Sequence, residues 1–136
     1  MEQCPFCQII AGKAPAQIVC ETAHTLSVLD IDPIQEGHIL ILPKIHAASI
    51  SQIPETVLTE MMLTARKICI ALEEIYHPDG YTVMQNGGEF CDFGHAHLHI
   101  FPRYRGDGFG WIDPPGTFLH TEEIARTIRD HLNIEV

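Results

Sequence analysis

The stretch "HAHLHIFPR", residues 95–103, most constrains how this chain can fold, because histidines alternate in it with apolar residues. In a β-strand, residues two positions apart lie on the same face at a spacing of about 7 Å. One face would then carry three imidazoles and a phenyl ring: His95, His97, His99 and Phe101. The opposite face would carry the side chains that pack on the core: Ala96, Leu98 and Ile100. A helix would spread the rings around its circumference and would be interrupted by Pro102, so a strand is predicted.

Three imidazoles in strict register indicate a functional site, because they contribute little packing and cannot all be protonated without mutual repulsion. Two kinds of site fit this pattern. Neutral imidazole is a common zinc ligand. An imidazole can also attack phosphorus as a nucleophile, while a neighbouring ring donates protons to the phosphate oxygens or to the leaving group. The residue types alone leave both possibilities open.

Hydrophobic patterning elsewhere predicts an antiparallel sheet of about five strands. The ranges with strand-like composition are 16–22, 25–31, 38–43, 81–86 and 95–101. The first two are close enough in sequence to form a hairpin. Polar or glycine-containing turns separate the others.

A long amphipathic helix is predicted after Pro54, where apolar residues recur at a spacing of three to four. They are Val57, Leu58, Met61, Met62, Ala65, Ile68, Cys69, Leu72 and Ile75. A shorter helix is expected near the C-terminus, with Thr121 as its N-cap. Its inward-facing residues would be Ile124, Ala125, Ile128 and Leu132. The expected architecture is one α+β domain over residues 1–136, with the sheet covered by the long helix and the short C-terminal helix.

Charge and cysteine content exclude several classes of function. The chain has 8 Lys and Arg against 18 Asp and Glu, a formal net charge of -10. Nucleic-acid polymers and anionic membranes attract basic surfaces, so neither is an expected partner. No apolar run approaches the roughly 20 residues of a membrane span, and "MEQCPFCQII" lacks the features of a signal peptide. The cytoplasm is the expected location, where five cysteines would be reduced or would bind metal.

Several segments together resemble the histidine-triad (HIT) family. They are "CPFCQIIAGKAPA", "VLDIDPIQEGHILILPKIH", "YTVMQNGG" and "HAHLHIFPR". The last fits the family pattern of three histidines, each followed by an apolar residue. The segment "PRYRGDGFGW" is further similar to a bacterial-like, zinc-site-bearing branch. The resemblance implies a HIT-like fold and a homodimer.

The same resemblance implies a nucleotide hydrolase or transferase that works through a covalent nucleotidyl-histidine. His97, the middle histidine, would attack the α-phosphorus of a nucleoside phosphoramidate or related conjugate, and water would then release the monophosphate. His99 would contact the phosphate oxygens and support protonation of the leaving group. His95 would complete the catalytic triad, and His46 would match the family's fourth histidine.

The resemblance also implies where the nucleotide binds, with a purine nucleoside monophosphate or its conjugate as the ligand. Asp30 would hold the ribose hydroxyls, a role suited to an acceptor carboxylate. Asn86 would lie near the phosphate. The base would contact Phe6, Ile9, Val28 and Ile31.

Cys4 and Cys7 form a Cys-x-x-Cys pair near the N-terminus, without the strand–helix context of a thioredoxin-like redox motif. By resemblance to bacterial members of the family, His46 and His95 would complete a Cys₂His₂ zinc site. Such a closed site is structural, and the chemistry at His97 would not need the metal. Cys20, Cys69 and Cys91 are expected to be buried or incidental.

Two positions depart from the family pattern. Cys91 and Asp92 stand where relatives commonly have a glutamine and a small hydroxyl residue. A carboxylate at Asp92 would repel phosphate unless it turns away or orients a histidine. A nucleotide-binding or signalling module with little catalysis is therefore one alternative, and a metal-dependent hydrolase with the three histidines as an open zinc site is another. His38, at a boundary between turn and strand, is expected to be structural.

Overall fold

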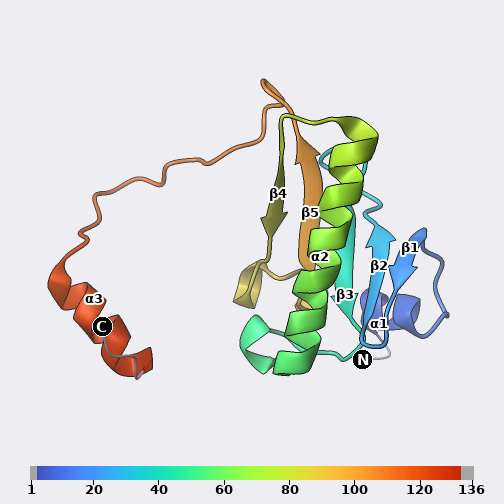
Figure 1. Ribbon diagram of the computed structural model, residues 1–136. Coiled ribbons are helices and arrows are strands. Elements are labelled where there is room, and N and C mark those ends of the chain that lie inside the picture. Colours follow the sequence, from blue (N-terminus) through green and yellow to red (C-terminus); the bar gives the residue numbers. More distant parts are fainter. Residues whose placement is uncertain (1–2, 133–136) are drawn as a thin grey trace.

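The computed structural model describes residues 3–132 and contains one five-stranded antiparallel sheet (Figure 1). Its strands lie in the order β1-β2-β3-β5-β4. Their bounds are β1 (Ile18–Glu21), β2 (Thr25–Leu29), β3 (Ile39–Pro43), β4 (Gly80–Met84) and β5 (Leu98–Arg103). All of these pairs are antiparallel. The prediction of an α+β fold with a sheet of this size is confirmed.

The long helix α2 (Glu55–Tyr76) covers one face of the sheet (Figure 1). It begins after Pro54 and ends at His77, which adopts a left-handed conformation with φ of 45°. Its buried stripe packs against Ile41, Leu98 and Ile100. The members of that stripe are Val57, Met61, Thr64, Ala65, Ile68, Cys69 and Leu72. Met62 and Ile75, both expected in the stripe, are instead exposed.

The opposite face of the sheet carries the short helix α1 (Pro5–Ile10). A second apolar cluster forms there, and its residues are Cys4, Phe6, Leu26, Val28, Leu40 and Leu42. Successive residues of β3 alternate between the two clusters, because the side chains of a strand alternate between faces. The face covered by α1 also carries the histidines of "HAHLHIFPR".

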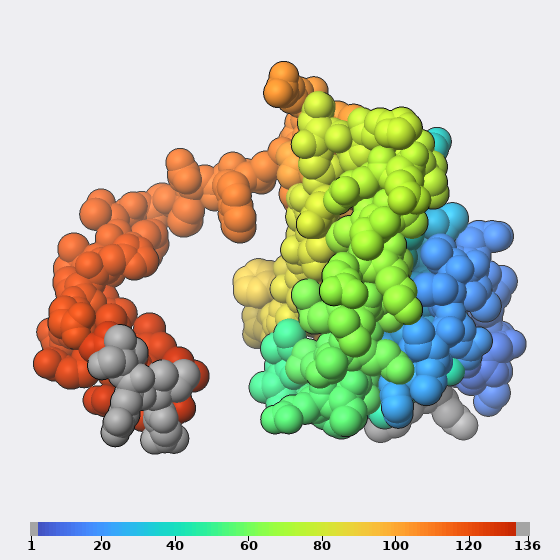
Figure 2. Space-filling model, in the orientation of Figure 1, coloured from blue at the N-terminus to red at the C-terminus, as the bar shows by residue number. Residues whose placement is uncertain are grey.

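The C-terminal helix α3 (Glu122–Leu132) does not cover the sheet (Figures 1 and 2). Residues 110–121, which include Pro114, Pro115 and Gly116, form an extended arm that carries the helix away from the domain. The prediction that its apolar residues face inward is therefore wrong within this chain: Ile124, Ile128 and Leu132 are exposed and Ala125 is half-buried. The N-cap is confirmed, because the Ile124 N–H donates to Thr121 Oγ1 at 3.3 Å.

Three single-turn helices complete the secondary structure: η1 (Ile50–Gln52), η2 (Gly88–Phe90) and η3 (Asp92–Gly94). No helix within residues 3–132 is long and apolar enough to cross a membrane. The single domain predicted over residues 1–136 also includes residues 1–2 and 133–136, which lie outside the described residues.

Candidate functional site

The alternation of "HAHLHIFPR" separates its residues as predicted. Ala96, Leu98 and Ile100 join the core beneath α2, while the three histidines lie on the other face. The histidines are nearly inaccessible: His95, His97 and His99 are 0%, 3% and 8% exposed. The regular strand starts only at Leu98, but the segment before it stays attached to the domain because the Ala96 N–H donates to the Ala47 carbonyl at 2.7 Å.

A row of hydrogen-bonded imidazoles runs along this face, and its two ends fix where every proton lies. At one end the Ile34 N–H donates to His38 Nδ1 at 3.0 Å, so the proton of the neutral His38 ring is on Nε2. His38 Nε2–H then donates to His99 Nδ1 at 2.9 Å, and His99 Nε2–H donates to His97 Nε2 at 3.0 Å. At the other end His97 Nδ1–H donates to the His95 carbonyl at 2.7 Å. Both ends agree that the lone pair of His97 is on Nε2.

Two rings of this row, His38 and His99, are uncharged at neutral pH. Burial lowers the pKa of His99 to about 4, and the neighbouring His97 and His38 rings oppose its protonation further. The carboxylates of Asp30 and Asp92 raise the pKa of His99, but by less than burial and the neighbouring rings lower it. Burial likewise lowers the pKa of His38. Each neutral ring carries one proton, as the hydrogen-bond row requires.

His38 is the residue that sequence reasoning missed. Its expected role was structural, and His46 was expected as the fourth histidine of the site. The structure places His38 Nε2 beside His99 and 3.5 Å from Asp30 Oδ2, whereas the His46 ring lies 5.0 Å from the His95 ring at the other end of the row. The sequence does not contain the register of β3 on β5. That register pairs Ile39 with Ile100 and so brings the preceding residue, His38, next to His99.

A cavity of about 280 Å³ opens in front of His97 and His99. Most residues expected to bind a nucleotide line it: Phe6, Ile9, Val28, Asp30, Ile31, His97 and His99. Asn86 is the exception, because it lies exposed in the turn after β4 and does not line the cavity. Apolar residues of α1 and β2 form part of its wall, and the Phe6 ring contacts that of His97 with centroids 4.9 Å apart.

The polar groups of the cavity are imidazoles and carboxylates. Asp30, Asp32 and Asp92 line it, and no Lys or Arg is among the described residues that do. Asp30 Oδ1 accepts the Asp32 N–H at 2.9 Å, so its turn is fixed at the end of β2. Any anionic group bound here must therefore be held by N–H donors of the imidazoles or the main chain and not by Lys or Arg.

At the far end of the row, Cys4, Cys7, His46 and His95 bring four potential metal ligands within 4.8 Å of one another. Pro5 starts α1, so the two cysteines flank its first turn. Cys7 Sγ lies 3.2 Å from His46 Nδ1 and 3.6 Å from His95 Nδ1, and Cys4 Sγ lies 3.6 Å from His95 Nδ1. Tetrahedral zinc with ordinary Zn–S and Zn–N bonds separates S and N ligands by about 3.6 Å. The donor set and its spacing fit such an ion.

His95 is oriented for this cluster and not for the cavity. Its Nε2–H donates to the Pro43 carbonyl at 2.9 Å, which leaves the lone pair on Nδ1, facing the cysteines. Its backbone carbonyl meanwhile fixes the tautomer of His97. The side chain of His95 therefore belongs to the cysteine–histidine cluster, and its main chain belongs to the imidazole row.

The sequence pattern of the HIT domain matches residues 11–106. The chain belongs to the HIT family. An adenosine 5'-monophosphoramidase of Candida albicans is 39% identical to it over 138 residues, which covers 95% of this chain and 91% of that relative. A HIT family protein from Bacillus anthracis has a similar crystal structure, with a TM-score of 0.86 and 30% identity over 97% of this chain and 96% of that one.

A second HIT structure bears on the cysteine–histidine cluster. The zinc-bound histidine triad family protein from Mycobacterium smegmatis is 33% identical, with a TM-score of 0.75 over 97% of this chain and 94% of that one. The HIT domain match ends before the C-terminal arm, which begins near Gly110. The family resemblance and the HIT-like fold predicted from the sequence are both confirmed.

Proposed function

We propose that this HIT protein hydrolyses nucleoside phosphoramidates or related nucleotide conjugates at the α-phosphate, through a covalent intermediate on His97. The observation that carries this proposal is the fixed tautomer of His97. A nucleophile needs a lone pair that it can direct at the substrate, and the lone pair of His97 is on Nε2. In this structure it accepts the His99 N–H, which would turn to the phosphate when a substrate enters the cavity that both rings line. The adenosine 5'-monophosphoramidase of Candida albicans supports the same reaction class.

The cavity lining supports one orientation of the nucleotide. The base would pack against Phe6, Ile9 and Val28 in the apolar part of the wall, with the exposed side chain of Ile31 at its edge. The ribose hydroxyls would donate to the carboxylate of Asp30. The α-phosphate would then lie at His97 and His99, where the latter offers an N–H to a phosphate oxygen once it no longer donates to His97.

In the first step, the lone pair of His97 Nε2 forms a bond to phosphorus while the bond from phosphorus to the leaving nitrogen breaks. The leaving amine takes up one proton. An anionic phosphate beside His99 favours protonation of that ring, so His99 would supply this proton. In the second step, water attacks phosphorus, the bond to His97 breaks, and the proton released by water returns to His99. The nucleoside monophosphate leaves with the enzyme restored.

The sequence also suggested an open zinc site made by the three histidines and a nucleotide-binding module without catalysis. An open zinc site made by three histidines receives no support, because His95 Nδ1 faces the cysteines while His97 Nε2 faces His99. A nucleotide-binding module without catalysis would use the same cavity. Turnover distinguishes it from a hydrolase.

Replacement of His97 by alanine should abolish hydrolysis. With adenosine 5'-phosphoramidate as substrate, we expect AMP release to fall by at least about a thousandfold in His97→Ala, because the attacking lone pair is removed. His24→Ala is the control, since His24 is exposed, its ring hydrogen-bonds to Glu60, and it does not line the cavity. A wild-type protein that binds AMP without turnover, or a variant as active as wild type, would contradict the hydrolase proposal.

We propose further that Cys4, Cys7, His46 and His95 hold a structural zinc ion. When bound, the metal would connect α1 to the segment that leads into β5, and its ligands would keep the His95 carbonyl in place for His97. Zinc chemistry is not required at the phosphate. The Mycobacterium smegmatis structure supports zinc as the ion.

Cys7→Ser should remove the zinc and destabilise the fold. We expect zinc content by elemental analysis to fall to background, and the midpoint of thermal unfolding to fall by at least about 5 °C. Cys20→Ser, a half-buried cysteine on β1, is the matched control and should change neither. Equal zinc content in wild type and Cys7→Ser would refute this site.

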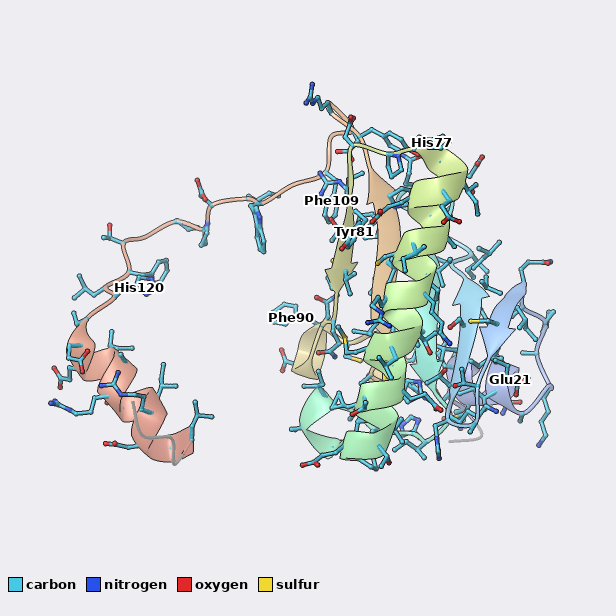
Figure 3. The ribbon with its side chains drawn as sticks, in the orientation of Figure 1. Glu21, His77, Tyr81, Phe90, Phe109 and His120 are labelled. Atoms are coloured by element: carbon cyan, nitrogen blue, oxygen red, sulfur yellow. The ribbon has the colours of Figure 1, made fainter. Side chains whose placement is uncertain are left out.

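We also propose that the protein is a homodimer. A groove between α2 and the edge strand β4 is lined by Met62, Ile70, Tyr81 and Val83, all of which are exposed, and Figure 3 shows Tyr81 on β4. The arm and α3 expose further apolar residues with no partner surface in the described part of the chain. A second copy, related by twofold symmetry, would cover both surfaces at once.

Ile70→Glu should shift the protein toward monomer in sedimentation equilibrium, because a charge would be buried in the groove. Ile18→Glu is the control, since Ile18 is also exposed but lies on β1 at the opposite edge of the sheet. A wild-type protein that remains monomeric at high micromolar concentration would overturn the dimer.

A further inference from the structure

Asp92 occupies a fixed position at the mouth of the cavity. It begins the single-turn helix η3, and the Asp92 carbonyl accepts the His95 N–H at 3.4 Å. The next residue, Phe93, adopts a left-handed φ of 61° and packs edge-on against Phe6, with ring centroids 5.2 Å apart. A positive φ is unfavourable for a phenylalanine, so this contact holds a turn that is locally strained. Asp92 therefore lines the cavity together with His97 and His99.

The carboxylate of Asp92 is available to a ligand. It is exposed and makes no hydrogen bond or ion pair with any of residues 3–132. The other two cavity carboxylates lie together at the end of β2, where Asp30 accepts the Asp32 N–H. Without a Lys or Arg among the described lining residues, the field at the mouth is negative.

The direction of the reaction determines which part of the substrate meets Asp92. In an in-line displacement, the leaving group lies on the side of phosphorus opposite to the attacking nitrogen of His97. The apolar part of the cavity wall suits the base, and Asp30 suits the ribose. Of the three carboxylates that line the cavity, Asp30 and Asp32 lie together at the end of β2, which leaves Asp92 as the charged group for the leaving group to meet.

We propose that Asp92 selects for leaving groups that carry a positive charge. On the proposed function, on which this inference rests, the preferred substrates are nucleoside phosphoramidates whose amine portion bears a second, cationic group such as an alkylammonium. Anionic leaving groups, including further phosphates, are disfavoured by the same charge. An aspartate in place of the small hydroxyl residue at this position would make the rate depend on the charge of the leaving group.

Three adenosine 5'-phosphoramidates with the same phosphorus–nitrogen bond provide the test. Their amine portions are 6-aminohexyl, hexyl and 5-carboxypentyl, so only a remote charge differs. For the wild type we expect kcat/KM to decrease in that order, by roughly threefold to tenfold per step, as a carboxylate several ångströms from a partly solvated charge would produce. Added salt should reduce the difference.

Asp92→Asn should make the three rates equal, and Asp92→Lys should reverse their order. Glu89→Gln is the matched control, because Glu89 lies in η2 next to the exposed Phe90, which points away from the sheet in Figure 3, and outside the cavity lining. In Glu89→Gln, the three values of kcat/KM should decrease in the same order as in the wild type.

Failure of this inference and failure of the proposed function give different results. No AMP from any of the three compounds, or from the unsubstituted phosphoramidate, refutes the function. Turnover with equal rates in the wild type, or an order unchanged in Asp92→Asn, refutes the charge selection and leaves the hydrolase intact. A uniform loss of rate for all three in a folded Asp92→Asn also refutes it, because Asp92 would then act on the chemistry itself.

Discussion

The site depends on a row of imidazole hydrogen bonds that is anchored at both ends by the main chain. A backbone N–H can only donate and a backbone carbonyl can only accept, so Ile34 and His95 leave a single arrangement of protons for the rings between them. Three imidazole side chains in contact would otherwise have several tautomeric states. The anchors give His97 a lone pair on Nε2 without any nearby base to remove a proton.

The fold provides these anchors through two separate features. The antiparallel pairing of β3 with β5 brings His38 alongside His99, and the turn before β3 supplies the Ile34 N–H. At the other end, His95 donates to the Pro43 carbonyl and points its Nδ1 at the cysteines. A zinc ion there would hold the segment whose carbonyl orients His97. His95 would then couple the structural metal to the nucleophile, because its side chain would bind the metal and its carbonyl accepts the His97 N–H.

Local patterns in the sequence predicted those features that depend on neighbouring residues. Alternation in "HAHLHIFPR" placed Ala96, Leu98 and Ile100 in the core and the histidines opposite. The Cys-x-x-Cys pair indicated possible metal ligands, and the family resemblance supplied His46 and His95 as the other two. The role of His38 could not be found this way, because it depends on strand register between segments 61 residues apart. The amphipathic pattern of α3 correctly predicted a helix with one apolar face, but periodicity carries no information on which surface covers that face. The family resemblance, and not the pattern, supplied the nucleotide contacts, of which Asn86 lies away from the cavity.

The most direct test of this account is long-range ¹H–¹⁵N correlation NMR of the histidine rings near pH 7.5, which reports the protonated nitrogen of each imidazole. The expected spectrum has His97 protonated on Nδ1 alone, with His38 and His99 each protonated on Nε2 alone. Finding the proton of His97 on Nε2, or a doubly protonated ring at that position, would mean that no lone pair faces phosphorus and would contradict the mechanism.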